Sequence, residues 1–434
     1  MKFQIPKGLF DILPYGADKS WKLSSRWHHL ENILHQLTLE YGYTEIRTPA
    51  FEKEDLFNRS IGEASDIVKK EMYTFKDKAD RLLSLRPEGT ASVMRAFVES
   101  HLDQERNFHK LYYIGPMFRY DRPQAGRYRQ HHQFGVEVLG SSGYEVVVEV
   151  IDLFYQLTKR LGLKDISLNI NSVGDEKARK TYQKELVKFL TPLKLKLSKD
   201  SQERLKKNPL RILDSKEKCD QELLNKAPSI LDFLTKESQD QLQNTLTLLK
   251  RINIDYVVNP KLVRGLDYYN DVVFEFMTKN QGAQNSICGG GRYDTLVESF
   301  GGPDIPGVGL AAGLERILQT MEEQAISYPV EMESFVYFAP LDDKYTDECF
   351  ELITTLRHAN IPCDMSFNVK KLPKMIQDGV KKGAKLLIII GEDEIKSKKI
   401  TCKNLDTREQ QTVSMQELPA FLQKQYKKYQ DNPR

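Results

Sequence analysis

Two strand-like segments separated by an arginine-rich turn are the feature that most restricts the fold. Residues 110–118 (KLYYIGPMF) and 132–140 (HQFGVEVLG) are apolar and rich in β-forming residues, which predicts the two strands of a long hairpin. The turn between them carries Arg119, Arg122, Arg127 and Arg129. Because guanidinium groups bind phosphate through paired hydrogen bonds, this concentration predicts an anion site. A hairpin with ordinary solvated surface charge is the alternative interpretation.

Strand alternation assigns faces to the hairpin. It puts Gly115 and Arg119 on one face of the first strand, and Gln133, Gly135 and Glu137 on one face of the second. If these two faces coincide, an arginine, an amide and a carboxylate surround one cavity. Gly135 then leaves space for a ligand to lie against the sheet.

A long helical block interrupts the strand pattern. Strand-like stretches occur at 166–174, 271–278 and 286–291, on either side of a segment rich in Lys, Leu, Gln and Glu. That segment, about residues 175–256, predicts a helical insertion. We therefore expect an α+β fold in which one mostly antiparallel sheet is interrupted by the insertion. Amphipathic spacing predicts helices over 18–41, 143–163 and 307–324.

Strand and helix patterns alternate toward the C-terminus, from residue 335 to residue 391. This alternation predicts a separate small α/β domain. The expected domains are 1–328, containing the insertion, and 329–434. On a helix of the second domain, Lys374 and Lys381 belong to a basic face, with Lys370 and Lys385, and Val380 belongs to the opposite apolar stripe. Such a face is either merely solvated or suited to RNA.

Composition indicates an ordinary intracellular protein. The 434 residues are 40% hydrophobic and 29% charged, with a net charge of +3, so a nucleic-acid partner would be recognised by local basic patches. The five cysteines are scattered without a C-x-x-C pair, which favours reduced thiols over a structural metal site. We find neither a signal peptide nor an apolar run of about 20 residues, and expect a cytoplasmic location and no membrane span.

Three further stretches place reactive side chains beside glycines. In RPEGT, Glu88 lies at a turn and Thr90 is expected to N-cap the next helix. Glu88 either presents its carboxylate to an ammonium group or belongs to plain turn chemistry. In LVRGLDYYN, Arg264 precedes Tyr268 and Tyr269, of which one is expected to reach a pocket, since neighbours on a strand point to opposite faces.

Alternative interpretations stay open for these stretches as well. Arg264 and Asp267 are alternatively an ion pair beside core aromatic residues. Arg316, in GVGLAAGLERIL, is alternatively an ordinary surface residue. The CGGGRYD run, which ends near Tyr293, allows close backbone approach but is weak alone.

Taken together, these stretches resemble the class II aminoacyl-tRNA synthetases. Similarity to their motifs 1, 2 and 3 is carried by residues 41–52, 113–140 and 307–318. Within the class, residues 85–90, 262–270 and 288–297 resemble the histidyl-tRNA synthetase family, and NPLRILDSK (208–216) resembles its bacterial members. The resemblance covers nearly the whole chain. It implies a class II antiparallel sheet flanked by helices and an anticodon-binding role for the C-terminal α/β domain.

The resemblance also implies the substrates and their contacts. Histidine would be held at its α-amino group by Glu88, Thr90 and Gln133, and at its imidazole by Glu137 and Tyr269, with Tyr268 and Tyr293 completing the pocket. ATP would be bound by Arg119, Asp121, Arg127 and Arg316, and Mg²⁺ would come with it, without a metal site made of protein ligands alone. Arg264 and Arg119 would be the catalytic residues, with Arg264 also touching the substrate carboxylate.

The remaining implied partner is tRNA(His). Arg122 and Gln124 would meet its acceptor end, and Lys374 and Lys381 its anticodon region. Motif 1 implies a homodimer. One departure concerns Asp121, where many members carry the longer Glu, so its reach toward the nucleotide is in question.

Three functions are compatible with this picture. The first is an enzyme that charges tRNA with histidine through a histidyl-adenylate. The second is a non-catalytic, synthetase-like regulatory subunit of histidine biosynthesis, but here Arg119, Arg264, Arg316 and the C-terminal domain are all present. The third is a class II synthetase for another amino acid, against which Glu137 and the GLDYY stretch favour an imidazole.

Overall fold

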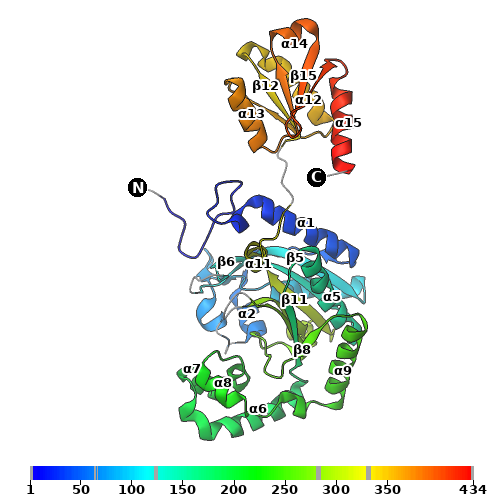
Figure 1. Cartoon of the computed structure of the whole chain (residues 1–434). Helices are drawn as coiled ribbons and strands as arrows, with labels where there is room; N and C mark the ends of the chain where they lie inside the picture. The colour runs from blue at the N-terminus through cyan, green and yellow to red at the C-terminus, as the bar shows by residue number, and fades with distance from the viewer. Residues whose placement is uncertain are drawn as a thin grey trace. The chain divides into compact units, whose positions relative to one another are not determined.

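The computed structural model describes residues 3–62, 65, 67–121, 126–279, 285–328 and 334–431. The chain forms two units, Met1–Ser327 and Tyr328–Arg434, each with its own sheet (Figure 1). Among the described helices, none is long and apolar enough to cross a bilayer.

An eight-stranded sheet is the framework of the first unit, with strand order β1-β5-β6-β11-β10-β9-β7-β8. Its strands are β1 (Thr44–Glu45), β5 (His109–Phe118), β6 (Gln130–Leu139), β7 (Ile166–Ser172), β8 (Tyr256–Val258), β9 (Asn270–Thr278), β10 (Ser286–Arg292) and β11 (Gly307–Gly313). Neighbouring strands are antiparallel except for the pairs β1–β5 and β7–β8. The prediction of a mostly antiparallel sheet is confirmed.

The register of the hairpin β5–β6 brings together the two faces that strand alternation had assigned. Tyr113 pairs with Gly135 and Gly115 pairs with Gln133, so the two expected faces coincide. The space above Gly135 is not left for a ligand, however. A side chain there would overlap the ring of Tyr113, so the hairpin fills this space with its own aromatic residue.

Four helices cover one face of this sheet: α1 (Ser24–Glu40), α5 (Tyr144–Arg160), α9 (Lys236–Arg251) and α11 (Leu314–Glu323). The apolar residues of α5 recur at helical spacing, among them Val147, Ile151 and Phe154, and all three are fully buried. The Phe154 ring packs on Phe276 of β9 with 4.8 Å between centroids. The opposite face of the sheet is thereby left for the functional site.

The predicted helix over 307–324 is wrong in its first half. Residues 307–313 form the strand β11, which lies between β6 and β10 and pairs with both. The small residues of this segment are compatible with either a helix or a closely packed central strand. The segment forms a strand because it can hydrogen-bond to β6 on one side and to β10 on the other. The helix begins only at Leu314.

Smaller elements surround the sheet on its open side. A three-stranded sheet has the order β2-β4-β3. Apart from η1 (Ser20–Lys22), which packs against α1 and α11, the elements are β2 (Phe51–Lys53), α2 (Glu54–Ile61), η2 (Ile67–Glu71), β3 (Thr74–Lys76), β4 (Leu82–Leu85), α3 (Thr90–Glu99), α4 (Leu102–Glu105) and α10 (Leu296–Ser299). They bring the turn after β4, with Glu88, to the face that the four helices leave uncovered.

The insertion is helical, as predicted. Between β7 and β8 the chain forms α6 (Glu176–Leu190), η3 (Thr191–Lys196), α7 (Lys199–Lys207), η4 (Pro209–Ile212), α8 (Lys218–Leu224), η5 (Ile230–Phe233) and α9. Figure 1 shows α6, α7 and α8 together at one end of the first unit, while α9 returns beside the sheet.

A buried carboxylate holds the turns of the insertion together. Asp220 is fully buried and accepts hydrogen bonds from the hydroxyls of Ser198, Ser201 and Ser215 at 2.6–2.7 Å and from the Ser198 amide at 2.8 Å. Burial opposes ionisation, but these hydrogen bonds outweigh it and lower the pKa of Asp220.

Asp220→Ala is therefore expected to lower the free energy of unfolding by about 3 kcal/mol, because it leaves several buried donors without an acceptor. Since the folded-state pKa of Asp220 is lowered, its contribution is present above the unfolded-state pKa and is lost as the pH falls through the folded value. Chemical denaturation followed by circular dichroism measures both effects. As a control, Asp240→Ala removes a carboxylate in an i,i+4 surface pair with Lys236 and should cost about 0.5 kcal/mol or less. An equal loss in the two variants would contradict the assignment.

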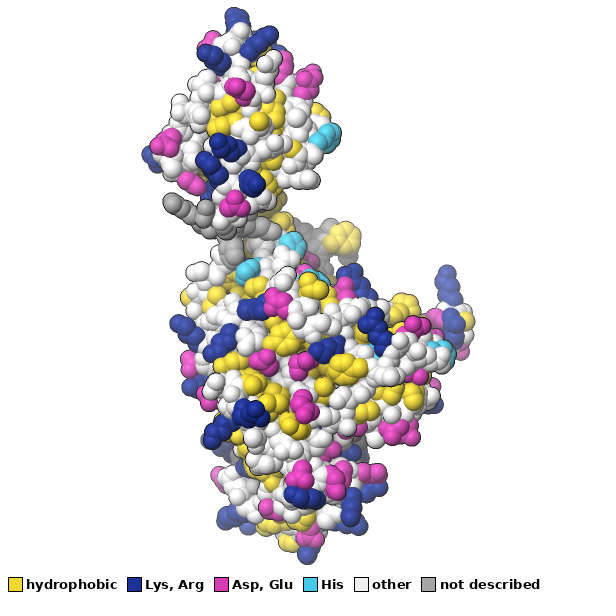
Figure 2. Space-filling view, turned by 90° about the vertical axis from the view of Figure 1, so that its right-hand side faces the viewer, with side chains coloured by type: hydrophobic (Ala, Val, Ile, Leu, Met, Phe, Trp, Pro, Cys, Tyr) yellow, Lys and Arg dark blue, Asp and Glu magenta, His cyan; other side chains and the backbone are white. Residues whose placement is uncertain are grey.

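The second unit is a five-stranded sheet with order β13-β12-β14-β15-β16. Its elements are β12 (Val336–Pro340), η7 (Asp343–Tyr345), α12 (Thr346–His358), β13 (Cys363–Met365), α13 (Leu372–Lys381), β14 (Leu386–Ile390), α14 (Glu392–Ser397), β15 (Lys399–Asn404), β16 (Gln410–Ser414) and α15 (Leu418–Asp431). The strands β12, β13 and β14 are parallel, which confirms the α/β prediction, and β15 and β16 add an antiparallel hairpin. Figure 2 shows basic and acidic side chains interspersed on the visible face of each unit.

Candidate active site

A cavity of about 510 Å³ lies on the face of the large sheet opposite the four helices. The hairpin, the turn after β4, the loop before β9, β10, α11 and the insertion all contribute to its lining. Most of the predicted site residues line it: Glu88, Thr90, Arg119, Asp121, Arg127, Gln133, Arg264, Tyr268, Tyr269 and Arg316. Segments as far apart in sequence as Ile67 and Arg316 thus meet around one space.

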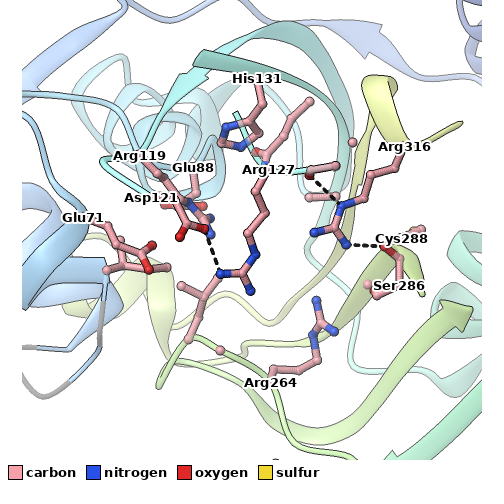
Figure 3. A pocket seen from close by; sticks show the side chains of 18 of the residues that line it. Glu71, Glu88, Arg119, Asp121, Arg127, His131, Arg264, Ser286, Cys288 and Arg316 are labelled. Atoms are coloured by element: carbon pink, nitrogen blue, oxygen red, sulfur yellow. Dashed lines mark hydrogen bonds and ion pairs between the residues drawn. The ribbon is translucent and has the colours of Figure 1, made fainter. Parts of the chain in front are cut away.

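Arginines dominate one part of the cavity. In Figure 3 the guanidinium groups of Arg127, Arg264 and Arg316 point into the same space from the hairpin, the loop before β9 and α11. Arg119 follows β5 directly and is anchored by donating from Nε to the Pro87 carbonyl at 2.8 Å. Such a cluster of cations attracts an anion with several charges.

Burial disfavours the charged form of two of these arginines. It lowers the pKa of Arg119 and of Arg316, and the neighbouring positive charge of Arg127 acts in the same direction on both. Arg316 is held by the carbonyls of Gly126, at 3.3 Å, and Ser286, while Arg127 pairs with Asp121 at 2.8 Å. The interpretation of Arg316 as an ordinary surface residue is therefore wrong. These two carbonyls hold its guanidinium group in place at the cavity.

Arg264 has a different partner from the one considered on sequence grounds. Its Nη1 pairs with Glu275 of β9 at 2.9 Å, whereas Asp267 accepts a hydrogen bond from Asn208 at 3.1 Å. The guanidinium lies directly against Gly289, where any side chain would overlap it. The glycine run of β10 thus provides the close approach that its sequence indicated, and the group that approaches is Arg264.

Glu88 caps α3, a role that the sequence assigned to Thr90. Both carboxylate oxygens of Glu88 accept backbone amides, from Thr90 at 2.7 Å and Ala91 at 2.9 Å. Burial raises the pKa of Glu88, and these hydrogen bonds oppose the shift. Its remaining lone pairs are available in the cavity. Nearby, Oε1 of Gln133 is buried and has no hydrogen-bond partner among the described residues, so a second acceptor faces the same region.

Beneath this region lies a buried carboxylate, Glu137, only 1% exposed. It accepts hydrogen bonds from the hydroxyls of Thr90, at 2.8 Å, and Tyr293. Burial raises the pKa of Glu137 to about 8. At neutral pH this group is therefore close to its titration point, which is typical of a carboxyl that interacts with a ligand.

Both adjacent tyrosines reach the cavity, so the expectation of one was wrong. Tyr268 and Tyr269 lie in a turn before β9, where strand alternation does not apply, and their ring centroids are 4.7 Å apart. Tyr293 stands edge-on to Tyr268 at 5.7 Å. Burial raises the pKa of Tyr269 to about 12, so its hydroxyl stays protonated and can donate. Tyr268 and Tyr269 thus line a recess of the cavity, whereas the predicted site residues Glu137 and Tyr293 are not among its lining residues and lie buried next to it, bonded to each other.

Several lining residues had no predicted role. They are Glu71, His131, Arg204, Arg211, Asp214 and Glu315. Burial, together with the nearby charges of Arg119 and Arg316, lowers the pKa of His131 well below its usual value, so its imidazole is neutral. Glu315 is buried and accepts from the amide and Nδ1 of His132 at 2.9 Å. The sequence indicated a role for Glu315 only through its position next to Arg316. Arg204, Arg211 and Asp214 come from the insertion, for which no site residue was predicted.

Of the predicted tRNA contacts, only Lys374 and Lys381 fall on residues that the structure describes. Arg122 and Gln124 lie outside the described residues. Lys374 and Lys381 are exposed on α13, but Lys370 and Lys385 lie beyond its ends and pair with Asp378 and Asp406. Val380, expected in the apolar stripe, is 56% exposed, because Gly379 instead packs on Tyr337. The predicted basic face is therefore smaller than expected.

Known proteins match the chain over nearly its whole length. A family model described as histidyl-tRNA synthetase matches residues 17–317. The chain belongs to this family. A second model, of the anticodon binding domain, matches residues 335–425.

Individual members of the histidyl-tRNA synthetase family are closely similar. The histidine--tRNA ligase of Protochlamydia amoebophila (strain UWE25) is 49% identical over 422 residues, which are 97% of this chain and all of that protein. The histidine--tRNA ligase of Streptococcus pyogenes serotype M18 is 45% identical over 420 residues, 96% of this chain and 97% of that protein. The crystal structure of apo S. aureus histidyl-tRNA synthetase matches with a TM-score of 0.81 and 38% identity, over 97% of this chain and 100% of that one.

Proposed function

We infer that this histidyl-tRNA synthetase family member is a histidine–tRNA ligase. It joins histidine and ATP into histidyl-adenylate and pyrophosphate, and then transfers histidine to the 3′ end of tRNA(His). The observation that carries this inference is one cavity with two halves: a recess lined by Tyr268 and Tyr269 beside the buried carboxyl of Glu137, and a cluster of arginines that lines the rest. The first half suits an imidazole and the second a triphosphate.

Histidine would occupy the recess. Its ammonium group needs acceptors, and Glu88 and the unpaired Oε1 of Gln133 supply them, with the Thr90 hydroxyl beside them. Its imidazole has one nitrogen that donates and one that accepts. Glu137 can accept from the first, and the protonated hydroxyl of Tyr269 can donate to the second. A side chain without these nitrogens would leave both groups buried and unpaired, which is how polar sites reject analogues.

ATP would occupy the arginine half, with the α-phosphate at Arg119 and Arg264 and the γ-phosphate at Arg316. The histidine carboxylate attacks the α-phosphorus; a new P–O bond forms while the bond to pyrophosphate breaks. Negative charge accumulates on phosphoryl oxygens, and guanidinium groups already held in place stabilise it without reorganising. No nucleophile from the protein is needed.

Mg²⁺ would enter with ATP. In the part of the chain that the structure describes, no group of three or more His, Cys, Asp or Glu side chains is arranged to hold a metal. Mg²⁺ commonly uses one or two carboxylates together with substrate phosphates and water. Glu71 and Asp121 line the cavity near Arg119 and fit that role, although Asp121 is also paired with Arg127. When bound, the ion would neutralise part of the phosphate charge.

The remaining partners follow from the family. We propose that the module from 329 to 434 binds the anticodon of tRNA(His), with Lys374 and Lys381 at its surface, that Arg122 and Gln124 meet the acceptor end, and that the protein acts in the cytoplasm as a homodimer. Analytical ultracentrifugation tests the dimer, and footprinting of tRNA(His) tests the module.

Pyrophosphate exchange with ATP, measured separately with each of the twenty amino acids, tests the function. We expect exchange with histidine alone. Exchange with a different amino acid would indicate a different synthetase. A folded protein without exchange would instead indicate the regulatory subunit. That function is the weaker candidate, because the arginine cluster is present and relatives at 45–49% identity are named histidine--tRNA ligase.

A further inference from the structure

The loop that carries Arg264, Tyr268 and Tyr269 has no strand ladder to hold it. Residues 264–269 lie between β8 and β9 and belong to no regular element. Main-chain carbonyls in such a loop need donors from elsewhere, and the positions of those donors then determine the conformation of the loop. Here the donors come from the insertion.

Arg211, in η4, holds the carbonyls of two successive peptide groups, Arg264–Gly265 and Gly265–Leu266. Its Nη1 donates to the Arg264 carbonyl at 3.1 Å and its Nη2 to the Gly265 carbonyl at 2.8 Å. Two hydrogen bonds from one planar group to successive carbonyls fix the direction of the peptide as well as its position. The direction of that peptide sets where the Arg264 side chain leaves the backbone.

Two more side chains of the insertion hold the second half of the loop. Nη1 of Arg179, in α6, donates to the Tyr269 carbonyl at 2.8 Å and to the Asp267 carbonyl at 3.4 Å. Asn208, next to η4, donates to Oδ1 of Asp267 at 3.1 Å. Each half of the loop therefore has its own arginine, one beside Arg264 and one beside Tyr269.

We propose that Arg211 and Arg179 are positioning residues, through which the insertion controls the conformation of the catalytic loop and hence the rate of adenylate formation. The proposal rests on the catalytic role proposed above for Arg264. Neither arginine needs to touch a substrate for this effect. Any movement of η4 relative to the sheet withdraws the two hydrogen bonds that orient Arg264, so the position of the insertion is linked to chemistry even without tRNA.

The two arginines are expected to affect different kinetic constants. In pyrophosphate exchange without tRNA, Arg211→Ala should lower kcat about tenfold to a hundredfold, with the KM for histidine within about twofold, because small misplacements of a catalytic group have effects of this size. Arg179→Ala should instead raise the KM for histidine about tenfold, because it releases the Tyr269 carbonyl. Arg211→Lys, which keeps the charge but not the paired geometry, should fall between wild type and Arg211→Ala.

Controls separate positioning from folding. Arg251→Ala removes an exposed arginine at the end of α9 in the same insertion and should leave both constants unchanged. Melting temperatures of all variants are compared, and if Arg211→Ala does not fold, Arg211→Lys and Arg211→Gln carry the same kcat test. Equal effects on kcat and KM, or normal kcat in the Arg211 variants, would overturn the proposal.

A double-mutant cycle tests whether Arg211 acts through Arg264. In an Arg264→Lys background, Arg211→Ala should lower exchange by less than about twofold further, since residues that act as one unit are not additive. Fully multiplicative losses would overturn the proposal while leaving the role of Arg264 intact. Normal exchange by Arg264→Ala would show instead that the proposed function of Arg264 has failed.

Discussion

Arg264→Ala is expected to lower the rate of pyrophosphate exchange by about a thousandfold or more, the largest effect of any single substitution in the site. The guanidinium of Arg264 points into the space shared by Arg127 and Arg316, and Glu275 and Gly289 fix it from two sides. Removing a preorganised cation from a phosphoryl-transfer transition state costs a factor on the order of 10³ to 10⁵. Single-turnover formation of histidyl-adenylate measures the step directly.

Two measurements make this result specific. Binding of tRNA(His) to the Arg264→Ala variant, measured by filter retention, should be within about twofold of wild type, because Arg264 is enclosed in the cavity rather than on the surface. Arg264→Lys should recover only part of the activity, since an ammonium group lacks the planar fork that contacts two oxygens. Near-normal exchange by Arg264→Ala would refute the assigned role.

Glu137→Gln is expected to raise the KM for histidine about tenfold to a hundredfold and to change its dependence on pH. A hydrogen bond to a charged group contributes about 1.5–3 kcal/mol, and glutamine cannot supply the charge. In the free protein, burial raises the pKa of Glu137 to about 8. The ionised form that accepts from the imidazole N–H therefore becomes more populated as the pH rises toward 8, and kcat/KM for histidine should increase up to about that pH and then level off.

The same pKa shift has the opposite effect on stability, and this provides a check. Because the folded-state pKa of Glu137 is raised from 4.5, its contribution to stability is full below the unfolded-state value and is lost as the pH rises through about 8. Histidine should therefore raise the melting temperature more at pH 8 than at pH 6 in wild type. Glu137→Gln should show a pH-independent shift. A wild-type kcat/KM that falls between pH 6 and 8 would contradict this account.

Local patterns predicted much of this molecule. Alternation along two strands was enough for the hairpin and for the residues on each face, because the period of two is a local property of a strand, whereas the register that pairs Gln133 with Gly115 came from the structure. The helical insertion was equally visible, since seven helical segments in a row leave no alternating stretch. The density of arginines at the hairpin turn indicated an anion site and supplied Arg119 and Arg127, whereas Arg264 and Arg316 join them from other segments.

What could not be predicted depends on partners that are distant in sequence. Residues 307–313 became a strand because β6 and β10 leave one place between them, which no pattern within those residues reveals. Tyr268 and Tyr269 both face the cavity because their backbone leaves the strand geometry on which alternation depends. Arg211 lies 53 residues before the carbonyl of Arg264 that it holds, so its role had no local signal.

The position of β11 also sets the order in which the first unit is completed during synthesis. Although β11 is the last strand of this sheet to leave the ribosome, its place is between β6 and β10. Until Gly313 emerges, those two strands have unpaired edges, which are templates for aggregation. At ordinary elongation rates, β6 waits on the order of ten to thirty seconds for its partner. A chain that stops before β11 lacks both the closing strand and Arg316, so we expect incomplete products to be insoluble and inactive, with chaperones covering β6 in the interval.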